Sequence, residues 1–280
     1  MNIPSISVVI PCFNQGEYIK DALASLEQCD RTLFEIIIVN DGSTDEFTNR
    51  YLKALSEQGI FVLFQDNMGL AQARNNGIRK AKGKYILPLD SDNKIRPDYL
   101  TTGIEILDKY KEVAVVYGNG NYFGNKEGML KPGKFNLQRL MLRNYIDACT
   151  VIRKSVIEEV GYYHSMKFMG LEDWDLWLRI AFAGHRFYYV DAVLFDYRVS
   201  AQSMIKELTG SIEKQNRIEE YFLQKYADKL SPEDVLKDTI NRFKRKPFRF
   251  LRKIFLKKYF RAYYEKLIKN NKIYSNDFYD

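Results

Sequence analysis

Short apolar, β-branched runs alternate with helical patterns along the first half of the chain, and this alternation limits the fold more than any other feature. The apolar runs cover residues 6–10, 34–39, 61–64, 84–89 and 113–117. Helical patterns lie between several of them, at residues 17–27, 69–82 and 97–110. Strands buried on both faces are continuously apolar, and strands that alternate with helices form mostly parallel sheets covered on both sides. The sequence therefore predicts an α/β fold with a mostly parallel sheet flanked by helices.

The pattern changes after residue 117. Residues 118–133 are rich in Gly and Asn with aromatic interruptions, which predicts a hairpin or loop lining a site rather than a core element. Further strands are expected at residues 148–153, 186–190 and 192–197, and helices at 154–160 and 170–180. Beyond residue 203 the composition is helical and charged, and Ser231-Pro232 is typical of a helix start.

Acidic residues follow two of the predicted strands. Asp41 ends the second apolar run, and Asp90 and Asp92 come directly after the fourth. Open α/β sheets bind ligands at the carboxyl ends of their strands. Two aspartates this close repel one another unless a cation lies between them, and their hard oxygens suit Mg²⁺ or Mn²⁺ held together with substrate phosphates. Taken alone, Asp-x-Asp also fits a solvated turn or a helix cap.

The net charge of +7 is concentrated near the C-terminus. Residues 242–269 contain twelve Lys and Arg against the single Glu265, so the remainder of the chain is net negative. This distribution argues against nucleic-acid binding by the main domain. The N-terminus lacks the pattern of a secretion signal, no apolar run is long enough to cross a bilayer, and the three cysteines fit no disulfide framework. We therefore expect a cytoplasmic protein.

Two common nucleotide-binding motifs are missing. Gly118-Asn119-Gly120 does not complete the dinucleotide fingerprint, because Phe123 stands at the third glycine position. The sequence also contains no GxxxxGK[ST] phosphate loop.

Five ordered segments resemble the family 2 glycosyltransferases of the GT-A fold. They are VVIPCFN at 8–14, IVNDGSTD at 38–45, NMGLAQARNNGI at 67–78, GKYI with DSDN at 83–93, and EDWDLWLR at 172–179. The resemblance covers roughly residues 5–200. It implies a GT-A catalytic domain over residues 1–205, followed by a helical, basic C-terminal extension over residues 206–280.

The resemblance implies an inverting transfer of a sugar from a nucleotide-diphospho-sugar, with UDP as the expected carrier. The expected acceptor is a hydroxyl of a glycan or a lipid-linked molecule, in the synthesis of bacterial surface polysaccharide. Asp41 would accept a hydrogen bond from uracil N3–H, which discriminates against bases that lack this donor. The nucleotide-binding residues implied are Pro11, Phe13, Asn14, Glu17, Asp41, Asn67, Gly69, Arg74, Asp90 and Ser91.

The same resemblance assigns the metal and the catalytic acids. Asp92, with Asp90, would hold Mn²⁺ or Mg²⁺ against the departing diphosphate. Asp173 matches the family's general base, and Glu172 or Asp175 would orient it or bind the acceptor. Acids in the first turn of a helix also serve simply as partners of the helix dipole.

Two departures from the family pattern weaken the metal assignment. Asn93 replaces a frequent third aspartate, and Ser200 stands where many relatives carry a histidine. Two other functions stay open: a sugar-nucleotide nucleotidyltransferase, which should carry a basic phosphate loop after the first strand, and a non-catalytic sugar-binding relative.

The basic C-terminal segment also contains an apolar stripe. Phe248, Leu251, Phe255, Tyr259 and Ala262 recur at spacings of three and four residues, which places them on one side of a helix. Cationic helices with such a face bind anionic membrane surfaces. We expect residues 242–269 to dock on the inner face of the cell membrane. The alternative is that the stripe packs on the catalytic domain or on a second copy of the chain.

Overall fold

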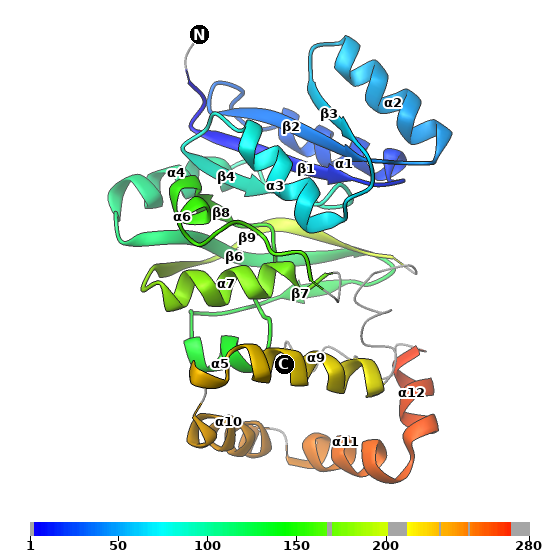
Figure 1. Ribbon diagram of the computed structural model, residues 1–280, viewed down its shortest axis with the longest axis vertical. Coiled ribbons are helices and arrows are strands. Elements are labelled where there is room, and N and C mark those ends of the chain that lie inside the picture. Colours follow the sequence, from blue (N-terminus) through cyan, green and yellow to red (C-terminus); the bar gives the residue numbers. More distant parts are fainter. Residues whose placement is uncertain (1–2, 167–169, 201–211, 230, 246, 270–280) are drawn as a thin grey trace. The chain divides into compact units, whose positions relative to one another are not determined.

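The computed structural model describes residues 3–166, 170–200, 212–229, 231–245 and 247–269, and the predicted α/β fold is confirmed in them (Figure 1). The strands are β1 (Ile6–Cys12), β2 (Phe34–Asp41), β3 (Phe61–Gln65), β4 (Tyr85–Pro88), β5 (Lys94–Ile95), β6 (Val113–Gly124), β7 (Gly128–Leu130), β8 (Val151–Arg153) and β9 (Arg186–Val199). The helices that accompany them are α1 (Gly16–Glu27), α2 (Glu46–Glu57), α3 (Leu70–Lys80), α4 (Tyr99–Lys109), α5 (Leu137–Leu142), α6 (Lys154–Glu159) and α7 (Glu172–Phe182).

The described strands form one sheet in the order β3-β2-β1-β4-β8-β6-β9-β5, with β7 paired to β6. β1 to β4 are parallel neighbours, and β6 pairs in parallel with β9. β8 runs antiparallel to both β4 and β6 and so joins the two parallel parts. The carboxyl ends of β1, β2 and β4 therefore meet at one edge of the sheet.

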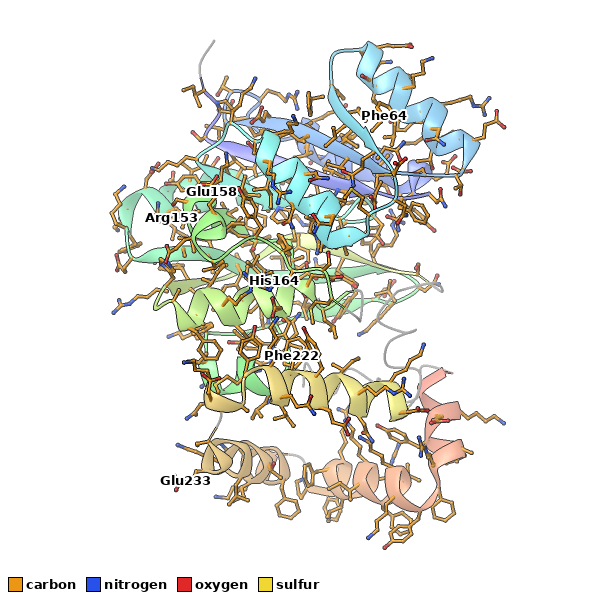
Figure 2. All side chains as sticks on the ribbon, viewed as in Figure 1. Phe64, Arg153, Glu158, His164, Phe222 and Glu233 are labelled. Carbon is orange, nitrogen blue, oxygen red and sulfur yellow. The ribbon has the colours of Figure 1, made fainter. Side chains whose placement is uncertain are left out.

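The central strands are buried because their residues are apolar on both faces. Every residue of β1 is buried. α3 packs against β1 and β2, and Figure 1 shows it crossing in front of the sheet. A Cβ on Gly77 of α3 would lie 2.4 Å from Cγ1 of Val9, so only glycine permits this close approach. On β8, the Arg153 side chain labelled in Figure 2 donates to the carbonyls of Val113 and Tyr110 and so ties β8 to neighbouring elements.

Two expectations for the second half of the sheet are wrong. Residues 118–120 are not a loop but a buried part of β6, and the predicted strands at 186–190 and 192–197 are one strand, β9. The glycines of β6 allow close packing rather than a turn: a Cβ on Gly118 would lie 2.5 Å from Leu194, and one on Gly120 2.8 Å from the Phe195 ring. The hairpin itself is present, since β6 pairs with β7.

The described residues divide into two compact units. The first contains residues up to 135 and 146–200, and the second contains 136–145 and the helices from α9 onward. The predicted boundary at residue 205 lies outside the described residues. The elements of the second unit, besides α5, are α9 (Ile212–Lys225), η1 (Ala227–Lys229), α10 (Pro232–Arg245), α11 (Pro247–Tyr259) and α12 (Arg261–Lys269).

Helix packing in the second unit follows its apolar residues. Ile218 and Phe222 of α9, Tyr226 and Tyr264 are buried, and Figure 2 labels Phe222. α10 begins at Pro232, as the sequence predicts. None of the helices in the described part of the chain combines the length and the apolar composition that a membrane span requires.

Candidate functional site

The Asp41 carboxylate at the end of β2 is held by the loop that follows β3. Its Oδ1 accepts hydrogen bonds from the Gln65 side chain at 2.7 Å and the Met68 N–H at 2.8 Å, and its Oδ2 accepts from the Gly69 N–H at 2.9 Å. The residue is only 4% exposed. Gly42, with φ of 68°, follows directly, and a Cβ there would lie 2.5 Å from the backbone nitrogen of Asn67. Asp41 therefore fixes the segment around Asn67 and Gly69 at the edge of the sheet.

The segment after β1 is cross-linked to the turn after β2. Asn14 has a left-handed φ of 54°, and its Oδ1 accepts from the backbone N–H groups of Thr44 at 2.7 Å and Asp45 at 2.9 Å. Its Nδ2 donates to the Thr44 hydroxyl at 3.1 Å. Asp45 in turn caps α2 by accepting from the Thr48 N–H. The Asn14 amide thus shapes the site, and its contact with the nucleotide stays a prediction.

Its neighbours differ in accessibility. Pro11 is buried within β1, while Phe13 is 45% exposed beside the strand end. Glu17, in the first turn of α1, is exposed and pairs with Lys20 at 3.1 Å. Ser91 donates its hydroxyl proton to the Gln15 side chain. Of these predicted nucleotide-binding residues, Phe13 presents an exposed ring that a planar base could stack on.

Arg74 and Asp90 form a buried ion pair. Nη2 of Arg74, on α3, lies 2.5 Å from Oδ1 of Asp90, and the two side chains are 3% and 30% exposed. Burial alone would lower the pKa of Arg74, but the nearby charges of Asp90, Glu172 and Asp173 outweigh it and raise the pKa. The Nε of Arg74 is buried without a hydrogen-bond partner in the described structure. The Arg74 guanidinium thus lies near Asp90, a predicted metal ligand, and near the predicted catalytic residues Glu172 and Asp173.

The surroundings of Asp92 disfavour its charged form. Burial and then the charge of Asp90 raise the pKa of Asp92 to about 7, although Arg198 opposes this. Arg198 lies on β9: its Nε donates to the Asp92 carbonyl at 3.0 Å, and its backbone N–H donates to Oδ1 of Asn93 at 2.9 Å. Asn93 is 1% exposed. Its amide oxygen therefore holds β9 in place, which gives this departure from the family pattern a structural role.

The three acids at the start of α7 differ in their surroundings. Glu172 is 2% exposed, and its Oε2 accepts from the Gly170 N–H at 2.7 Å. Burial, partly offset by Arg74, raises the pKa of Glu172. Asp173 is half-buried and accepts from the Trp174 N–H at 2.7 Å. Of the three, Asp173 alone is accessible.

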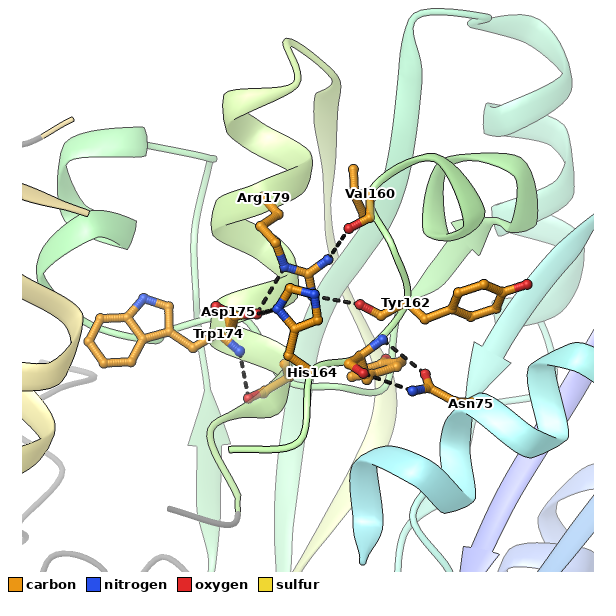
Figure 3. Close-up of polar contacts among 9 residues, drawn as sticks. Asn75, Val160, Tyr162, His164, Trp174, Asp175 and Arg179 are labelled. Atoms are coloured by element: carbon orange, nitrogen blue, oxygen red, sulfur yellow. Dashed lines mark hydrogen bonds and ion pairs between the residues drawn. The ribbon is translucent and has the colours of Figure 1, made fainter. Parts of the chain in front are cut away.

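Asp175 belongs to a closed network, drawn in Figure 3. Its side chain is 0% exposed and its Oδ2 lies 2.9 Å from Nε of Arg179 and 3.1 Å from Nδ1 of His164. Arg179 also donates to the carbonyls of Val160 and Tyr162. The buried carboxylate is positioned to hold residues 160–164. That Asp175 binds the acceptor or orients the base stays a prediction.

Residues 163 and 165 are fixed from the other side by α3. Asn75 donates to the Tyr163 carbonyl at 2.7 Å and accepts from its N–H at 2.9 Å, and Gln72 donates to Ser165. The Tyr163 ring centroid lies 5.4 Å from the guanidinium carbon of Arg74, and its hydroxyl is buried without a partner in the described structure.

Sequence patterns missed three residues around this site: Asp147, Tyr163 and Arg198. Asp147 precedes β8, and burial and then the charge of Asp90 raise its pKa to about 7. Arg198 was visible in the sequence only as the neighbour of Ser200. None of the three lies in a sequence motif that indicates a function.

Comparison with known proteins assigns the family. A model described as Glycosyl transferase family 2 matches residues 7–173. The chain belongs to this family. An uncharacterized glycosyltransferase of Rickettsia prowazekii (strain Madrid E) is 29% identical over 249 residues, which are 83% of this chain and 74% of that protein. One of Rickettsia bellii (strain RML369-C) is 28% identical over 250 residues, 84% of this chain and 35% of that protein. The predicted class of enzyme, a glycosyltransferase, is confirmed.

Solved structures show the same fold. Staphylococcus aureus TarS 1–349 in complex with UDP-GlcNAc superposes with a TM-score of 0.62 at 18% identity, over 84% of this chain and 70% of that chain. TarS 1–349 alone gives a TM-score of 0.59 at 19% identity, over 84% and 69%. The GT-A-type fold implied by the sequence is therefore confirmed. The roles of individual site residues stay predictions.

Proposed function

We propose that this glycosyltransferase moves a sugar, with inversion at the anomeric carbon, from a UDP-sugar to a hydroxyl of a glycan or lipid-linked acceptor. The observation that carries the proposal is the arrangement of Asp41, Asp92 and Asp173. Asp41 ends β2 and Asp92 comes after β4, and both strands are parallel neighbours of β1. The charge of Asp173 acts on Arg74, and Arg74 is paired with Asp90.

The donor nucleotide is expected beside Asp41 and Phe13. Asp41 is buried and already accepts three hydrogen bonds. A carboxylate accepts about four, so Asp41 can accept one more, from a fixed direction. A fixed acceptor that meets an imide N–H favours uracil over bases without that donor. The similarity to a fold solved with UDP-GlcNAc supports this donor class.

The residues fit a divalent cation. Asp90 is paired with Arg74, whereas Asp92 is half-buried and has a raised pKa. No group of three or more potential ligands among His, Cys, Asp and Glu occurs in the described residues, so substrate phosphates would complete the coordination. Asp92 would be the main protein ligand, with Asp90 beside it. A bound Mn²⁺ or Mg²⁺ would neutralise charge on the departing diphosphate.

Asp173 is the proposed general base. It would take the proton of the acceptor hydroxyl as that oxygen attacks the anomeric carbon on the face opposite the diphosphate. Its accessibility supports this role, because Glu172 and Asp175 are buried. Asp175 is expected to act through His164 and residues 160–164, and Glu172 through its attraction to Arg74. Bacterial surface polysaccharide is the proposed pathway.

A thermal-shift panel tests the donor. Wild type with Mn²⁺ should be stabilised by UDP and by at least one UDP-sugar, because a ligand at a hundredfold its Kd adds about 2.7 kcal/mol. Asp41→Asn should lose this response, while Glu57→Gln on the exposed end of α2 should keep it. Equal stabilisation by all nucleoside diphosphates would contradict the uracil assignment. Release of pyrophosphate from UTP and a sugar phosphate would favour a nucleotidyltransferase, and donor binding without transfer or hydrolysis a non-catalytic relative.

The second unit is proposed to dock on an anionic membrane surface. Four predicted stripe residues of α11 are exposed: Phe248 at 87%, Leu251 at 52%, Phe255 at 52% and Tyr259 at 62%. Ala262 falls on α12 instead, because the two helices separate at Phe260. Figure 2 shows ring side chains of α10 and α11 projecting away from α9. Together with the twelve Lys and Arg of residues 242–269, this face complements an anionic leaflet.

Co-sedimentation with phosphatidylserine vesicles tests the docking. Wild type should bind at low salt and release at high salt, and the double variant Phe248→Ser/Phe255→Ser should bind weakly. Phe64→Ser, which removes a ring that is 50% exposed on β3, serves as the matched control and should bind like wild type. If the double variant binds as wild type does, the docking proposal fails. If the wild type instead dimerises in solution through this face, the stripe is a contact between copies.

A further inference from the structure

Asp147 lies beside the Asp90-Ser91-Asp92 motif because of the way β8 enters the sheet. β8 is antiparallel to β4, with Tyr85 opposite Arg153 and Ile86 opposite Ile152. Because the two strands run in opposite directions, the segment before β8 and the segment after β4 lie at the same edge of the sheet. The position agrees with the charge of Asp90 acting on the Asp147 carboxyl.

The backbone around Asp147 is held on both sides. The Trp177 indole of α7 donates to the carbonyl of Ile146 at 3.1 Å. On the other side, the Tyr99 hydroxyl donates to the carbonyl of Cys149 at 2.8 Å. The Asp147 side chain itself accepts from the Cys149 N–H through Oδ1 at 2.9 Å. The backbone on either side of Asp147 is therefore held by α4 and by α7, the helix that begins with Glu172 and Asp173.

The chain leaves this carboxyl group incompletely satisfied. Within the described residues, Oδ2 has no hydrogen-bond donor, although a carboxylate oxygen accepts up to two. The neighbouring Asp90 and Asp173 are also acidic, and the attraction of Arg74 is shared with Asp90. Half-burial with an incomplete set of donors is costly for a charged carboxyl group. A ligand with hydroxyl donors would remove this cost.

A second observation points to a polar ligand in the same place. Nε of Arg74 and the hydroxyl of Tyr163 are buried without hydrogen-bond partners in the described structure, and both residues are at most 3% exposed. Both groups feel the charges of Asp90 and Asp173. Asp90, Arg74, Tyr163 and Asp147 are thus close enough to act on one another, and Arg74 and Tyr163 each keep a polar atom without a partner in the described structure.

We propose that Asp147 accepts a hydrogen bond from a hydroxyl of the donor sugar, and so helps to decide which UDP-sugar the enzyme uses. This inference rests on the proposed UDP-sugar function. Asp147 lies at the sheet edge where the Asp90-Ser91-Asp92 motif follows β4 and where the donor is proposed to bind, so the donor sugar rather than the acceptor is the assigned partner. A polyhydroxylated ring supplies the donors that Oδ2 lacks.

The experiment compares wild type, Asp147→Asn and Glu57→Gln with Mn²⁺ present. Affinities are measured for UDP and for UDP-glucose, UDP-galactose, UDP-N-acetylglucosamine and UDP-N-acetylgalactosamine. Asp147→Asn preserves shape and the acceptor for the Cys149 N–H, so UDP should bind within about twofold of wild type. The preference between the best and the worst UDP-sugar should fall about tenfold or more, as expected for one lost hydrogen bond to a charged acceptor. Glu57→Gln should retain the wild-type preference.

Three results separate the inference from the function on which it rests. Unchanged sugar preferences in Asp147→Asn would overturn the inference while leaving the function intact, as would a uniform loss of affinity for UDP and every UDP-sugar. Failure of wild type to bind any UDP compound would overturn both. If Asp147→Asn does not fold, Asp147→Glu makes the same test, because it keeps the charge but displaces the oxygens and should also reduce the preference.

Discussion

The carboxyl groups of the first unit differ in how far the chain itself satisfies them. Asp41 accepts three hydrogen bonds from the loop after β3, and Asp175 is held by Arg179 and His164. Asp92 and Asp147 lie next to another acid, and burial raises the pKa of each to about 7. Asp41 and Asp175 are buried and each has several internal partners, whereas Asp92 and Asp147 are half-buried, and Asp147 accepts a hydrogen bond from the Cys149 N–H.

This difference predicts which substitutions cost stability. Removing a satisfied buried carboxylate leaves its partners unpaired, so the substitution costs stability. Removing an unsatisfied one relieves a burial penalty, and the cost falls instead on the ligand that would have supplied the missing donors or charge. Substitutions in the first set should therefore cost stability, with a loss of donor binding as well at Asp41, whereas substitutions in the second set should cost function without a loss of stability.

The largest effect is expected at Asp173. Asp173→Asn should lower transfer by at least the ~10²–10⁴-fold typical of a general base. Donor binding and unfolding free energy should stay near wild type, because the base acts on the acceptor and its side chain is half-exposed. Initial rates with a UDP-sugar, together with Kd for UDP, measure both. Normal turnover by this variant would remove Asp173 from the mechanism.

Asp175, two residues away, should behave in the opposite way. Asp175→Asn should cost about 3 kcal/mol of unfolding free energy, near the low end for breaking a buried ion pair, because Arg179 keeps its bonds to two backbone carbonyls. Urea denaturation measures the change, with Glu57→Gln as the control. If Asp175→Asn were as stable as wild type but inactive, the catalytic role would move from Asp173 to Asp175.

The sequence was sufficient for the strand ends that follow local patterns. Asp41 and the Asp90-Ser91-Asp92 motif come directly after apolar runs, so their common edge follows from the parallel pairing of β1, β2 and β4. The helical spacing of Arg74 likewise placed it on α3. These positions depend on elements that can be recognised one at a time.

Other features depend on pairings that no local pattern reveals. Asp147 reaches the site through the antiparallel register of a three-residue strand, β8, with β4. Asn93 looks like a weakened metal ligand until β9 is paired beside it and donates to its oxygen. In the same way, Gly118 and Gly120 resemble loop residues, and only the packing of β9 shows why they are small.

Among the unsatisfied acids, Asp92 should show the larger functional effect. Mn²⁺ should raise the affinity of wild type for UDP, and Asp92→Asn should lose about tenfold or more of that gain, because a neutral amide attracts the cation far less than a carboxylate does. Titration calorimetry with and without Mn²⁺ measures the difference, and chelation should abolish it. An Asp92→Asn variant that retains the full Mn²⁺ effect and normal turnover would show that the cation binds elsewhere.

Asp147 should show the smallest effect, which appears as a pH dependence of stability. An unfolded aspartate ionises near pH 4, whereas the pKa of Asp147 in the folded chain is about 7. Below pH 4 the group is neutral in both states and has no effect. Between pH 4 and 7 it ionises only in the unfolded state, so its contribution to stability becomes more unfavourable as pH rises, and it is constant above pH 7.

Asp147→Asn removes this unfavourable, pH-dependent contribution to the free energy of unfolding. In the absence of nucleotide and divalent cations, the variant should therefore exceed wild type by about 1 kcal/mol or more at pH 8, a shift of about 2–4 °C in Tm for a domain of this size. The advantage should vanish near pH 4. Urea denaturation at both pH values measures it, and Glu57→Gln should show no such crossover. A variant less stable than wild type by the same amount at both pH values would place Asp147 with Asp41 and Asp175, among the carboxylates that the chain satisfies for itself.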